Sequence, residues 1–521
     1  MISENIHAQL DKVNKAFKHV TVGSATPSMG SPMIKSMDMQ SDLSGFMKDL
    51  ESAGLTYSSE LILRFVSAVL ERRFVVLSGL SGSGKTKLAQ AFVSWICKDA
   101  ISKVPLFTVG QIISAARSDN TITDVFDGAL VVAQGNGACA VLSNEIIMEW
   151  ADVIKENGFT EDTPIGTIKS AVLNKYSKYS PQMHSFDSTL KALALYVIGK
   201  NVCTRSYASS LLIPVGADWT NSEHLLGYPD ALQPGKYVMP DSGVLKMMLA
   251  AHDNPNLPFF LILDEMNLSH VERYFADFLS AMESGDDIKL YDGEDRFADG
   301  VKIPKTLKFP KNLFVIGTMN VDETTYMFSP KVLDRAQVIE FRVSDVEMAE
   351  FLKNPTTPNL DAIKGKGSQY AEAFLKLKDE IPELDASGST NKDAIAEALN
   401  KFFPELAKLG AEFGYRTANE VMRFCAYYLA AGATIDGAID AAIVQKLLPK
   451  LHGSRRKLER VLAELWKLCR KDGETDDLDV VAKASGDYDF AMKAKYPLSA
   501  EKVLRMFRSA VANGFASFAE A

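Results

Sequence analysis

The stretch FVVLSGLSGSGKTKLAQAFVSWI, residues 74–96, decides the fold of this chain. Its first five residues form an apolar run typical of a buried strand, and KLAQAFVSWI carries apolar residues at helical spacing. Between them, GLSGSGKT (Gly79 to Thr86) has the spacing GxxxxGK[ST] of a phosphate-binding loop, in the strand–loop–helix context that the motif requires. We therefore predict that this segment binds the phosphates of a nucleotide. A chance glycine-rich turn is the alternative.

The residue types in this loop suit a triphosphate. Glycines let backbone amides turn inward around phosphate oxygens, and the following helix N-terminus adds a partial positive charge. Lys85 should reach the β and γ phosphates, and Thr86 should place its hydroxyl on Mg²⁺. The predicted nucleotide-binding residues are Gly79, Leu80, Ser81, Gly82, Ser83, Gly84, Lys85, Thr86 and Lys87.

A second segment, PFFLILDE at residues 258–265, supplies two acids. An apolar strand that ends in Asp264 and Glu265 places both carboxylates at the carboxyl edge of the sheet, where ligands bind in open α/β folds. We expect Asp264 to hold Mg²⁺ and Glu265 to polarise the attacking water as a catalytic residue. The alternative is an acidic strand end that only faces solvent.

A third segment, FVIGTMN, is an apolar strand that ends in Asn320. A polar side chain there can hold the attacking water or the γ-phosphate, which is the sensor role in this class of NTPase. Taken alone the signal is weak, because asparagine after a strand is more often a turn residue. Its place after the loop and the acids favours the sensor interpretation.

Further short apolar runs alternate with helical patterns, which predicts an α/β fold with a parallel sheet flanked by helices. The predicted additional strands are 211–215, 313–317 and 337–341. Beyond about Asp345 amphipathic helical patterns dominate, so a C-terminal helical lid domain should follow. The expected parts are an N-terminal helix and flexible linker (1–57), a nucleotide-binding domain (58–344) with a mostly helical insert (104–203), and the lid (345–521). The linker prediction rests on residues 21–44, which are rich in Gly, Ser, Met and Pro.

Composition excludes several classes of protein. The chain has 521 residues and a net charge of −9, which argues against coating nucleic acid by bulk electrostatics. Its five cysteines show no CxxC spacing, which fits neither a zinc site nor a disulfide framework. No apolar run of about 18 residues that could span a bilayer is present, and the start has no apolar signal core. These features predict a cytoplasmic protein in a reducing compartment.

Three longer phrases resemble the AAA+ domain of the McrB family, the NTPase subunits of modification-dependent restriction systems. They are LDEMNLSHVERYFADFLSAMESG, GTMNVDETTYMFSPKVLDRA and IPVGADWTNSEHLLGYP. The resemblance runs from about Phe74 to the C-terminus and also takes in FGYRTANEVMRF and LLPKLHGSRRKLERVL. It implies an AAA+ P-loop NTPase that assembles into a hexameric ring and drives a separately encoded McrC-like nuclease against foreign or modified DNA.

The resemblance also assigns roles to single residues. Asn320 matches the sensor asparagine, and Asp322 the aspartate two places on. Arg335, in LDRA, falls where the family has an arginine finger that reaches the nucleotide of a neighbouring subunit; an arginine paired within its own helix is the alternative. Arg416, in FGYR, resembles the second sensor, which couples the lid to the γ-phosphate, and Arg423 is the competing candidate.

The nucleotide base and the activity stay open at this point. The family implies GTP, but this chain has no NKxD guanine-reading motif, and ATP is the usual substrate of AAA+ proteins. The phrase MNVDET also departs from the MNTADR of the best-known member. Two alternatives to the restriction NTPase remain: an AAA+ ATPase that remodels a polypeptide partner, and a nucleotide-dependent assembly scaffold with slow turnover.

The insert is a candidate for DNA contact. Residues 140–203 hold three helical phrases that could form a small winged-helix-like bundle, and KYSKYSPQMHS (175–185) mixes lysine, tyrosine and histidine, which are residue types used for phosphate and base contacts. Because acids balance the lysines in this span, a protein-contact or spacer domain is an equal alternative. We find no nuclease motif of spaced acids and lysine in the sequence, so a partner should cut any DNA.

Overall fold

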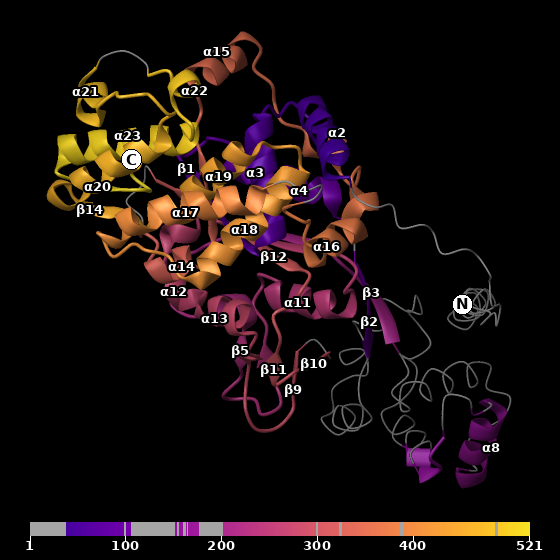
Figure 1. The fold of residues 1–521 in the computed structure, drawn as a ribbon. Coiled ribbons are helices and arrows are strands. Elements are labelled where there is room, and N and C mark those ends of the chain that lie inside the picture. The colour runs from indigo at the N-terminus through magenta and orange to yellow at the C-terminus, as the bar shows by residue number, and fades with distance from the viewer. Residues whose placement is uncertain are drawn as a thin grey trace.

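A five-stranded parallel sheet forms the centre of the molecule (Figure 1). The computed structural model describes residues 38–97, 100–105, 165–176, 202–298, 301–321, 326–385, 390–484 and 488–521, together with 149, 152–153, 156–159 and 163. The strand order is β13–β1–β12–β7–β4, and every neighbouring pair is parallel. The strands are β1 (Phe74–Gly79), β4 (Ser210–Pro214), β7 (Phe259–Asp264), β12 (Leu313–Asn320) and β13 (Gln337–Phe341). The predicted α/β fold with a parallel sheet flanked by helices is confirmed.

Helices cover both faces of the sheet, which explains why its central strands are mostly apolar. Every residue of β1 and β12 is buried. Phe314 of β12 packs against Phe374 on one face. Phe74 of β1 is paired with Val315, so it points to the other face, where it packs against Phe275. Burial on both faces is what parallel strands require.

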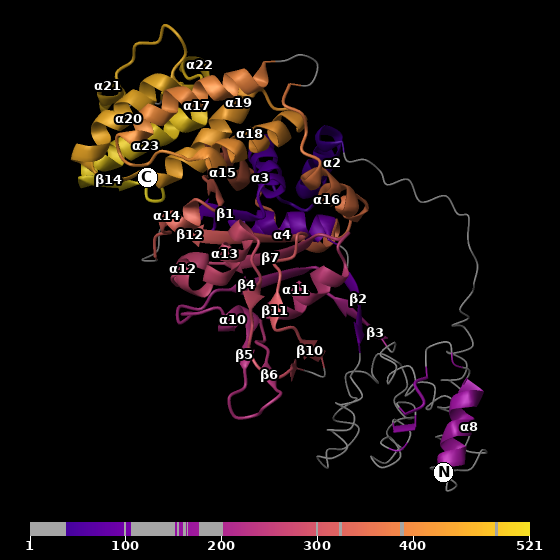
Figure 2. The same cartoon turned by 60° about the horizontal axis from the view of Figure 1, so that its bottom comes forward.

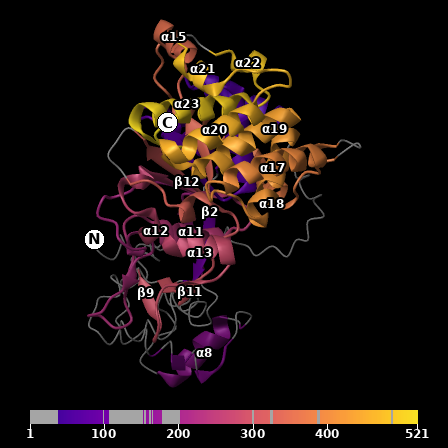
Figure 3. The same ribbon diagram turned by 60° about the vertical axis from the view of Figure 1, so that its left-hand side comes forward.

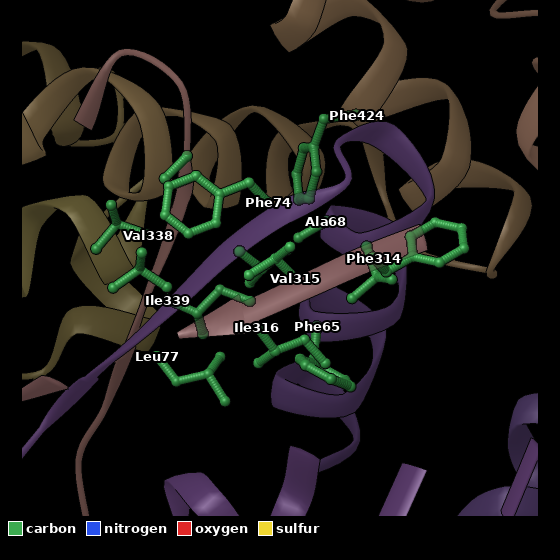
Figure 4. Packing of buried hydrophobic residues seen from close by; sticks show 14 of the residues in the cluster. Phe65, Ala68, Phe74, Leu77, Phe314, Val315, Ile316, Val338, Ile339 and Phe424 are labelled. Atoms are coloured by element: carbon green, nitrogen blue, oxygen red, sulfur yellow. The ribbon is translucent and has the colours of Figure 1, made fainter. Parts of the chain in front are cut away.

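The helices on the Phe314 face include α4 (Lys85–Ile96) and α16 (Ala371–Asp379), and α12 (Val271–Tyr274) and α13 (Ala276–Ser284) flank Phe275 on the other face. Helix α3 (Ser59–Glu71) leads into β1, and its N-cap Ser58 accepts the backbone N–H of Leu61. Figure 4 shows apolar side chains of α3, β1, β12 and β13 gathered with Phe424 into one cluster. This core holds the loop after β1 in a fixed place.

Shorter elements complete the sheet domain. They are α10 (Glu223–Leu226), α11 (Val244–Asp253), the 3₁₀ turn η1 (Met266–Leu268) and α14 (Pro330–Leu333). Three antiparallel pairs join β5 (Tyr228–Pro229) to β6 (Tyr237–Val238), β8 (Ile288–Lys289) to β11 (Thr306–Leu307), and β9 (Arg296–Ala298) to β10 (Val301–Ile303). These pairs lie on the side of the sheet away from the C-terminal helices (Figure 2).

Helices predominate after β13, as the sequence predicts. The chain continues through α15 (Asp345–Lys353), η2 (Leu360–Ile363), η3 (Ser368–Tyr370) and α16, and then α17 (Asn391–Ala407), α18 (Tyr415–Ala430) and α19 (Ile435–Ala442). A π-helical turn η5 (Ile443–Leu447) and η6 (Leu448–Lys450) lead to α20 (Arg455–Cys469), α21 (Leu478–Lys483), α22 (Phe490–Lys493) and α23 (Pro497–Asn513). Strand β14 (His452–Ser454), before α20, pairs with β15 (Phe515–Ser517), after α23. Figures 2 and 3 show the bundle as a layer beside the sheet domain.

Helix α2 (Met39–Ser52) corrects the predicted linker. Its apolar residues Met39, Leu43, Phe46 and Leu50 are at most 3% exposed, so residues 39–52 are packed helix and not flexible linker. Their spacing of three and four residues is the helical signal that the preceding Gly-, Ser-, Met- and Pro-rich composition obscured. The rest of that linker and the predicted helix at residues 2–20 lie outside the described residues.

The insert starts and ends on an antiparallel ribbon. Strands β2 (Ala100–Pro105) and β3 (Val202–Tyr207) pair along their whole length, so the chain leaves and re-enters the sheet domain side by side. Inside the insert the structure describes helix α8 (Ile165–Lys175), which agrees with a helical phrase predicted there. The remaining predicted helices and most of KYSKYSPQMHS lie outside the described residues. No helix within the described part of the chain combines the length and apolar character needed to cross a membrane.

Candidate functional site

The loop after β1 has the backbone shape that its glycines allow. Gly79, Gly82 and Gly84 have φ values of 153°, 75° and 93°, which lie in the region that glycine adopts most easily. A Cβ on Gly79 would lie 2.4 Å from the carbonyl oxygen of Phe341. Gly84 is also the N-cap residue of α4, so the loop delivers the chain directly into the helix N-terminus. Backbone amides and the start of a 12-residue helix therefore meet at one place.

Lys85 lies within this loop. Its side chain is buried, and its Nζ donates to the carbonyl oxygens of Gly79 at 2.8 Å and Leu80 at 2.6 Å. Nζ also lies 3.4 Å from Oγ of Ser83. The ammonium is thus held by the same loop that the sequence predicts to surround phosphates. Ser81 in the loop and Lys87 in the first turn of α4 are exposed.

Tyr57 is a contact of the loop that the sequence motif does not reveal. Its hydroxyl donates to the carbonyl oxygen of Gly84 at 2.9 Å. A Cβ at position 84 would stand 3.2 Å from the tyrosine ring, so the ring packs closely against this glycine. Burial raises the pKa of Tyr57, so the hydroxyl stays protonated and keeps donating. Tyr57 lies 27 residues before Gly84 in the chain, and an aromatic residue just before a helix N-cap was the only signal.

The first predicted acid meets the loop directly. The hydroxyl of Thr86, the second residue of α4, donates to Oδ1 of Asp264 at 2.7 Å. A second hydroxyl, that of Thr318 on β12, donates to the same Oδ1 at 2.6 Å. Three segments far apart in the chain therefore converge on one carboxylate, at the carboxyl edge where β1, β7 and β12 end.

Glu265 and Asn320 form the next pair. Glu265 has φ 53°, and it is the one non-glycine residue with positive φ in the described part of the chain. Such a conformation costs on the order of 1–3 kcal/mol and clusters at functional sites. Nδ2 of Asn320 lies 3.2 Å from Oε1 of Glu265 and donates to it. Buried Asn267 donates in turn to the carbonyl oxygen of Asn320 at 2.9 Å.

The phrases DEMN and GTMN contact each other residue by residue. Besides the pairs Asp264–Thr318 and Glu265–Asn320, Met266 lies over Gly317, where a Cβ would stand 2.5 Å from its Sδ. A side chain at position 317 would therefore push the turn after β7 away from β12.

Arg335 and Arg416 lie at the opposite, amino edge of the sheet. Nε of Arg72, which precedes β1, donates to the carbonyl oxygen of Arg335 at 2.5 Å. The guanidinium groups of Arg335 and Arg416 both contact the carboxylate of Glu283 on α13. Because a six-residue strand spans roughly 17–20 Å, both arginines are about that far from the phosphate loop of their own chain. The structure does not bring Arg416 to Lys85 and Asp264, where the second sensor was expected.

The pair at Glu283 is embedded in further charges. Glu420, which is 2% exposed, contacts Arg72 and lies 2.7 Å from Nζ of Lys446. Burial lowers the pKa of Arg335, and the neighbouring charge of Arg416 lowers it further. Burial also lowers the pKa of Lys446. Two like charges on one carboxylate are stable only while that carboxylate stays ionised.

Other candidates have simple placements. Arg423, the competing candidate for the second sensor, pairs at 2.6 Å with Glu71, the last residue of α3. It therefore also lies near the amino edge of the sheet. Asp322 lies outside the described residues. No group of three or more His, Cys, Asp and Glu side chains arranged to hold a metal ion occurs within the described ranges.

Comparison with known proteins matches the C-terminal region alone. Residues 360–515, from η2 to the start of β15, match a family model described as a domain of unknown function, DUF8727. A search among curated proteins finds no match. The matched family carries no stated activity, so the contacts of the site are the basis for a functional proposal.

Proposed function

We propose that the chain is a ring-forming nucleoside triphosphatase of the AAA+ P-loop type that hydrolyses ATP or GTP with Mg²⁺. The observation that carries this proposal is the 2.7 Å hydrogen bond from Thr86 to Asp264. It joins the start of the phosphate-loop helix to the acid at the end of β7, although the two residues are 178 positions apart. A parallel sheet with the loop-bearing strand inside it is compatible with this class of fold.

The residues present fit a magnesium ion. The Thr86 hydroxyl and the Asp264 carboxylate are hard oxygen donors, which Mg²⁺ prefers, and few protein ligands leave room for water and phosphate oxygens. When bound, Mg²⁺ neutralises charge on the β and γ phosphates. Lys85 adds a positive charge from inside the loop, and the backbone amides of Gly79 to Gly84 surround the phosphate oxygens.

Glu265 is the proposed catalytic residue for the attacking water. Its carboxylate takes the proton of the water as the water oxygen bonds to the γ-phosphorus, while the bond from that phosphorus to the β–γ bridging oxygen breaks and the nucleoside diphosphate leaves. Asn320, which donates to Oε1 at 3.2 Å, keeps that carboxylate oriented and leaves the second oxygen, Oε2, for the water. The strained φ of Glu265 supports a functional role, because such strain persists where the surroundings impose it.

The arginines at the amino edge serve a neighbouring subunit. Arg335 is too far from its own phosphate loop to act there, which supports an arginine finger that reaches across a subunit interface. Arg416 shares Glu283 with Arg335, so we assign it to the same interface and not to its own nucleotide. In the isolated chain Glu283 takes the place of the phosphate as the anion for both.

The biological role rests on the resemblance to the McrB family. It supports a hexamer that drives a McrC-like nuclease in the restriction of foreign or modified DNA. The base stays open between ATP and GTP, and DNA contact, direct or through the nuclease, belongs to the same proposal.

Turnover of ATP and GTP by the purified chain tests the proposal. Phosphate release with Mg²⁺ should be measured with and without DNA for the parent and for Glu265→Gln, with Glu294→Gln at an exposed position as the matched control. We expect Glu265→Gln to bind nucleotide and assemble normally but to turn over about 10²- to 10⁴-fold more slowly. Equal turnover by Glu265→Gln and the parent would reject the assignment.

The same assay separates the alternatives. Stimulation by DNA and by a coexpressed nuclease subunit favours the restriction NTPase. Stimulation by an unfolded or assembled polypeptide partner, with none by DNA, would instead indicate a remodelling ATPase. A ring that forms with nucleotide but releases almost no phosphate would indicate a scaffold.

A further inference from the structure

We infer that Thr318 is a positioning residue for the two acids of β7: its side-chain hydroxyl holds the Asp264 carboxylate and the Glu265 backbone in the orientation that hydrolysis needs. This inference rests on the proposed function and extends it to a residue outside the loop, acid and sensor positions. Thr318 lies on β12 two residues before Asn320, and no role follows from the sequence pattern at that position.

The hydroxyl of Thr318 both donates and accepts a hydrogen bond. Its Oγ1 donates to Oδ1 of Asp264 at 2.6 Å and accepts the backbone N–H of Glu265 at 3.0 Å. A threonine hydroxyl has one donor and two acceptor positions, so both bonds can exist together. The side chain is 1% exposed, which keeps water from competing for either bond.

The ladder between β7 and β12 shows why a side chain is needed here. The parallel pairing ends at Gly317 and Leu263. Two residues later, at Glu265, the chain turns away from the sheet with φ 53°. The N–H of Glu265 leaves the regular ladder at this point, and the Thr318 hydroxyl supplies the acceptor that a strand carbonyl would otherwise supply. The hydroxyl thus stabilises the bend that turns Glu265 toward Asn320.

Thr318 and Thr86 act on the same oxygen in different ways. Thr86 is the proposed magnesium ligand at the start of α4, and its hydroxyl donates to Asp264 at 2.7 Å. Thr318 is buried in β12, so it contacts neither nucleotide nor metal and acts only through Asp264 and Glu265. A loss of its hydroxyl should therefore affect metal dependence and kcat, while nucleotide binding by the loop changes little.

The matched pair Thr318→Ala and Thr318→Ser isolates the hydroxyl, because both variants lose the methyl group and only serine keeps the hydroxyl. We expect Thr318→Ala to lower kcat about 10- to 100-fold relative to Thr318→Ser, which is the loss expected for a buried hydrogen bond to a charged group. The Mg²⁺ concentration for half-maximal turnover should rise in Thr318→Ala, and KM for nucleotide should change less than threefold. Thr306→Val is the control, since its hydroxyl bonds exposed Asp287 at 3.2 Å, away from the site.

Folding is measured in parallel by thermal denaturation. A loss of turnover in Thr318→Ala that equals its loss of folded protein, with unchanged Mg²⁺ dependence, would overturn the inference in favour of a purely structural role. Equal kcat and Mg²⁺ dependence for Thr318→Ala and Thr318→Ser would overturn it as well. A parent chain that hydrolyses neither ATP nor GTP would instead remove the proposed function, and this inference with it, before any variant is compared.

Discussion

The candidate site at the carboxyl edge of the central sheet and the cluster around Glu283 and Glu420 at its amino edge both carry charged groups, but they satisfy them in different ways. At the carboxyl edge the Asp264 carboxylate accepts hydrogen bonds from two hydroxyl groups, and the Glu265 carboxylate accepts one from the side-chain amide of Asn320. The Lys85 ammonium donates to carbonyl oxygens of the loop. At the amino edge arginine and lysine side chains meet carboxylates, as in Arg335 and Arg416 with Glu283, and Lys446 with Glu420. Neutral partners orient charge without cancelling it, whereas ion pairs cancel it within the chain.

This difference indicates which edge receives a ligand from solution and which receives a second subunit. Groups held by neutral partners keep most of their charge for an incoming phosphate or metal ion. Groups held by an opposite charge are released only when another anion replaces the first, and a triphosphate on a neighbouring subunit is such an anion. The predictions below test each edge in turn.

The largest effect is expected at the carboxyl edge. Lys85→Ala removes the ammonium that lies inside the loop, and we expect it to abolish nucleotide binding and turnover completely. Titration with a fluorescent ATP or GTP analogue measures binding, and Lys311→Ala, at an exposed position, is the control. Binding by Lys85→Ala at the parental affinity would contradict the assignment of the loop.

A smaller, purely kinetic effect is expected at the amino edge. Arg335→Ala should bind nucleotide like the parent but turn over about 10³-fold more slowly in the assembled protein, because the removed guanidinium would stabilise charge in the transition state. Phosphate release should be compared with nucleotide affinity in the same preparation. A loss of affinity that equals the loss of turnover would indicate that Arg335 acts on the nucleotide of its own chain.

Mixed subunits sharpen this test. A mixture of Arg335→Ala and Glu265→Gln contains interfaces with an intact acid from one subunit and an intact arginine from the other, so part of the turnover should return. A mixture of Lys85→Ala and Glu265→Gln contains no intact site and should stay inactive. Absence of recovery in the first mixture would argue that the site is not shared.

The two edges also differ in how far the sequence predicts them. The loop, the acids and Asn320 each lie in a short contiguous phrase, and parallel strands bring their carboxyl ends to one edge, so their meeting could be predicted. The shared contact of Arg335 and Arg416 with Glu283 joins residues 52 and 133 positions apart in the chain, and no local pattern encodes that. The role of Thr318 could not be predicted for a different reason. Threonine is common in β-strands, so its presence in an apolar strand does not by itself indicate a functional role.

Tyr57 and α2 show the same limit on a smaller scale. Tyr57 reaches the loop because α3 lies beside β1, which is a tertiary arrangement. The apolar spacing of α2 was present in the sequence, but the composition before it suggested a linker. A functional contact can therefore be predicted where a short sequence motif determines the local backbone geometry. It is harder to predict where packing between helices brings the residues together.

The smallest effect concerns a carboxylate at the carboxyl edge that has charged partners. Glu340, near the end of β13, accepts from Lys502 at 2.8 Å and from Arg505 at 2.7 and 2.9 Å, both on α23. Although burial alone raises its pKa, Arg505 and Lys502 lower the pKa of Glu340 to about 2. Because its ion pairs cancel its charge within the chain, Glu340 should serve stability and not nucleotide binding.

Glu340→Gln should therefore destabilise the fold at pH 7 by roughly 3 kcal/mol, as expected for a pKa lowered from 4.5 to about 2, with KM for nucleotide unchanged. A lowered folded-state pKa contributes stability above the ordinary pKa of the carboxyl, and that contribution is lost as the pH falls through about 2. Urea denaturation of the parent and Glu340→Gln should thus differ most near pH 7 and converge as the pH falls below about 4.5 toward 2. Glu501→Gln, whose side chain is 38% exposed and 3.6 Å from Arg505, should cost under about 1 kcal/mol. A gap for Glu340→Gln that stays constant with pH would show that packing, not the ion pair, joins β13 to α23.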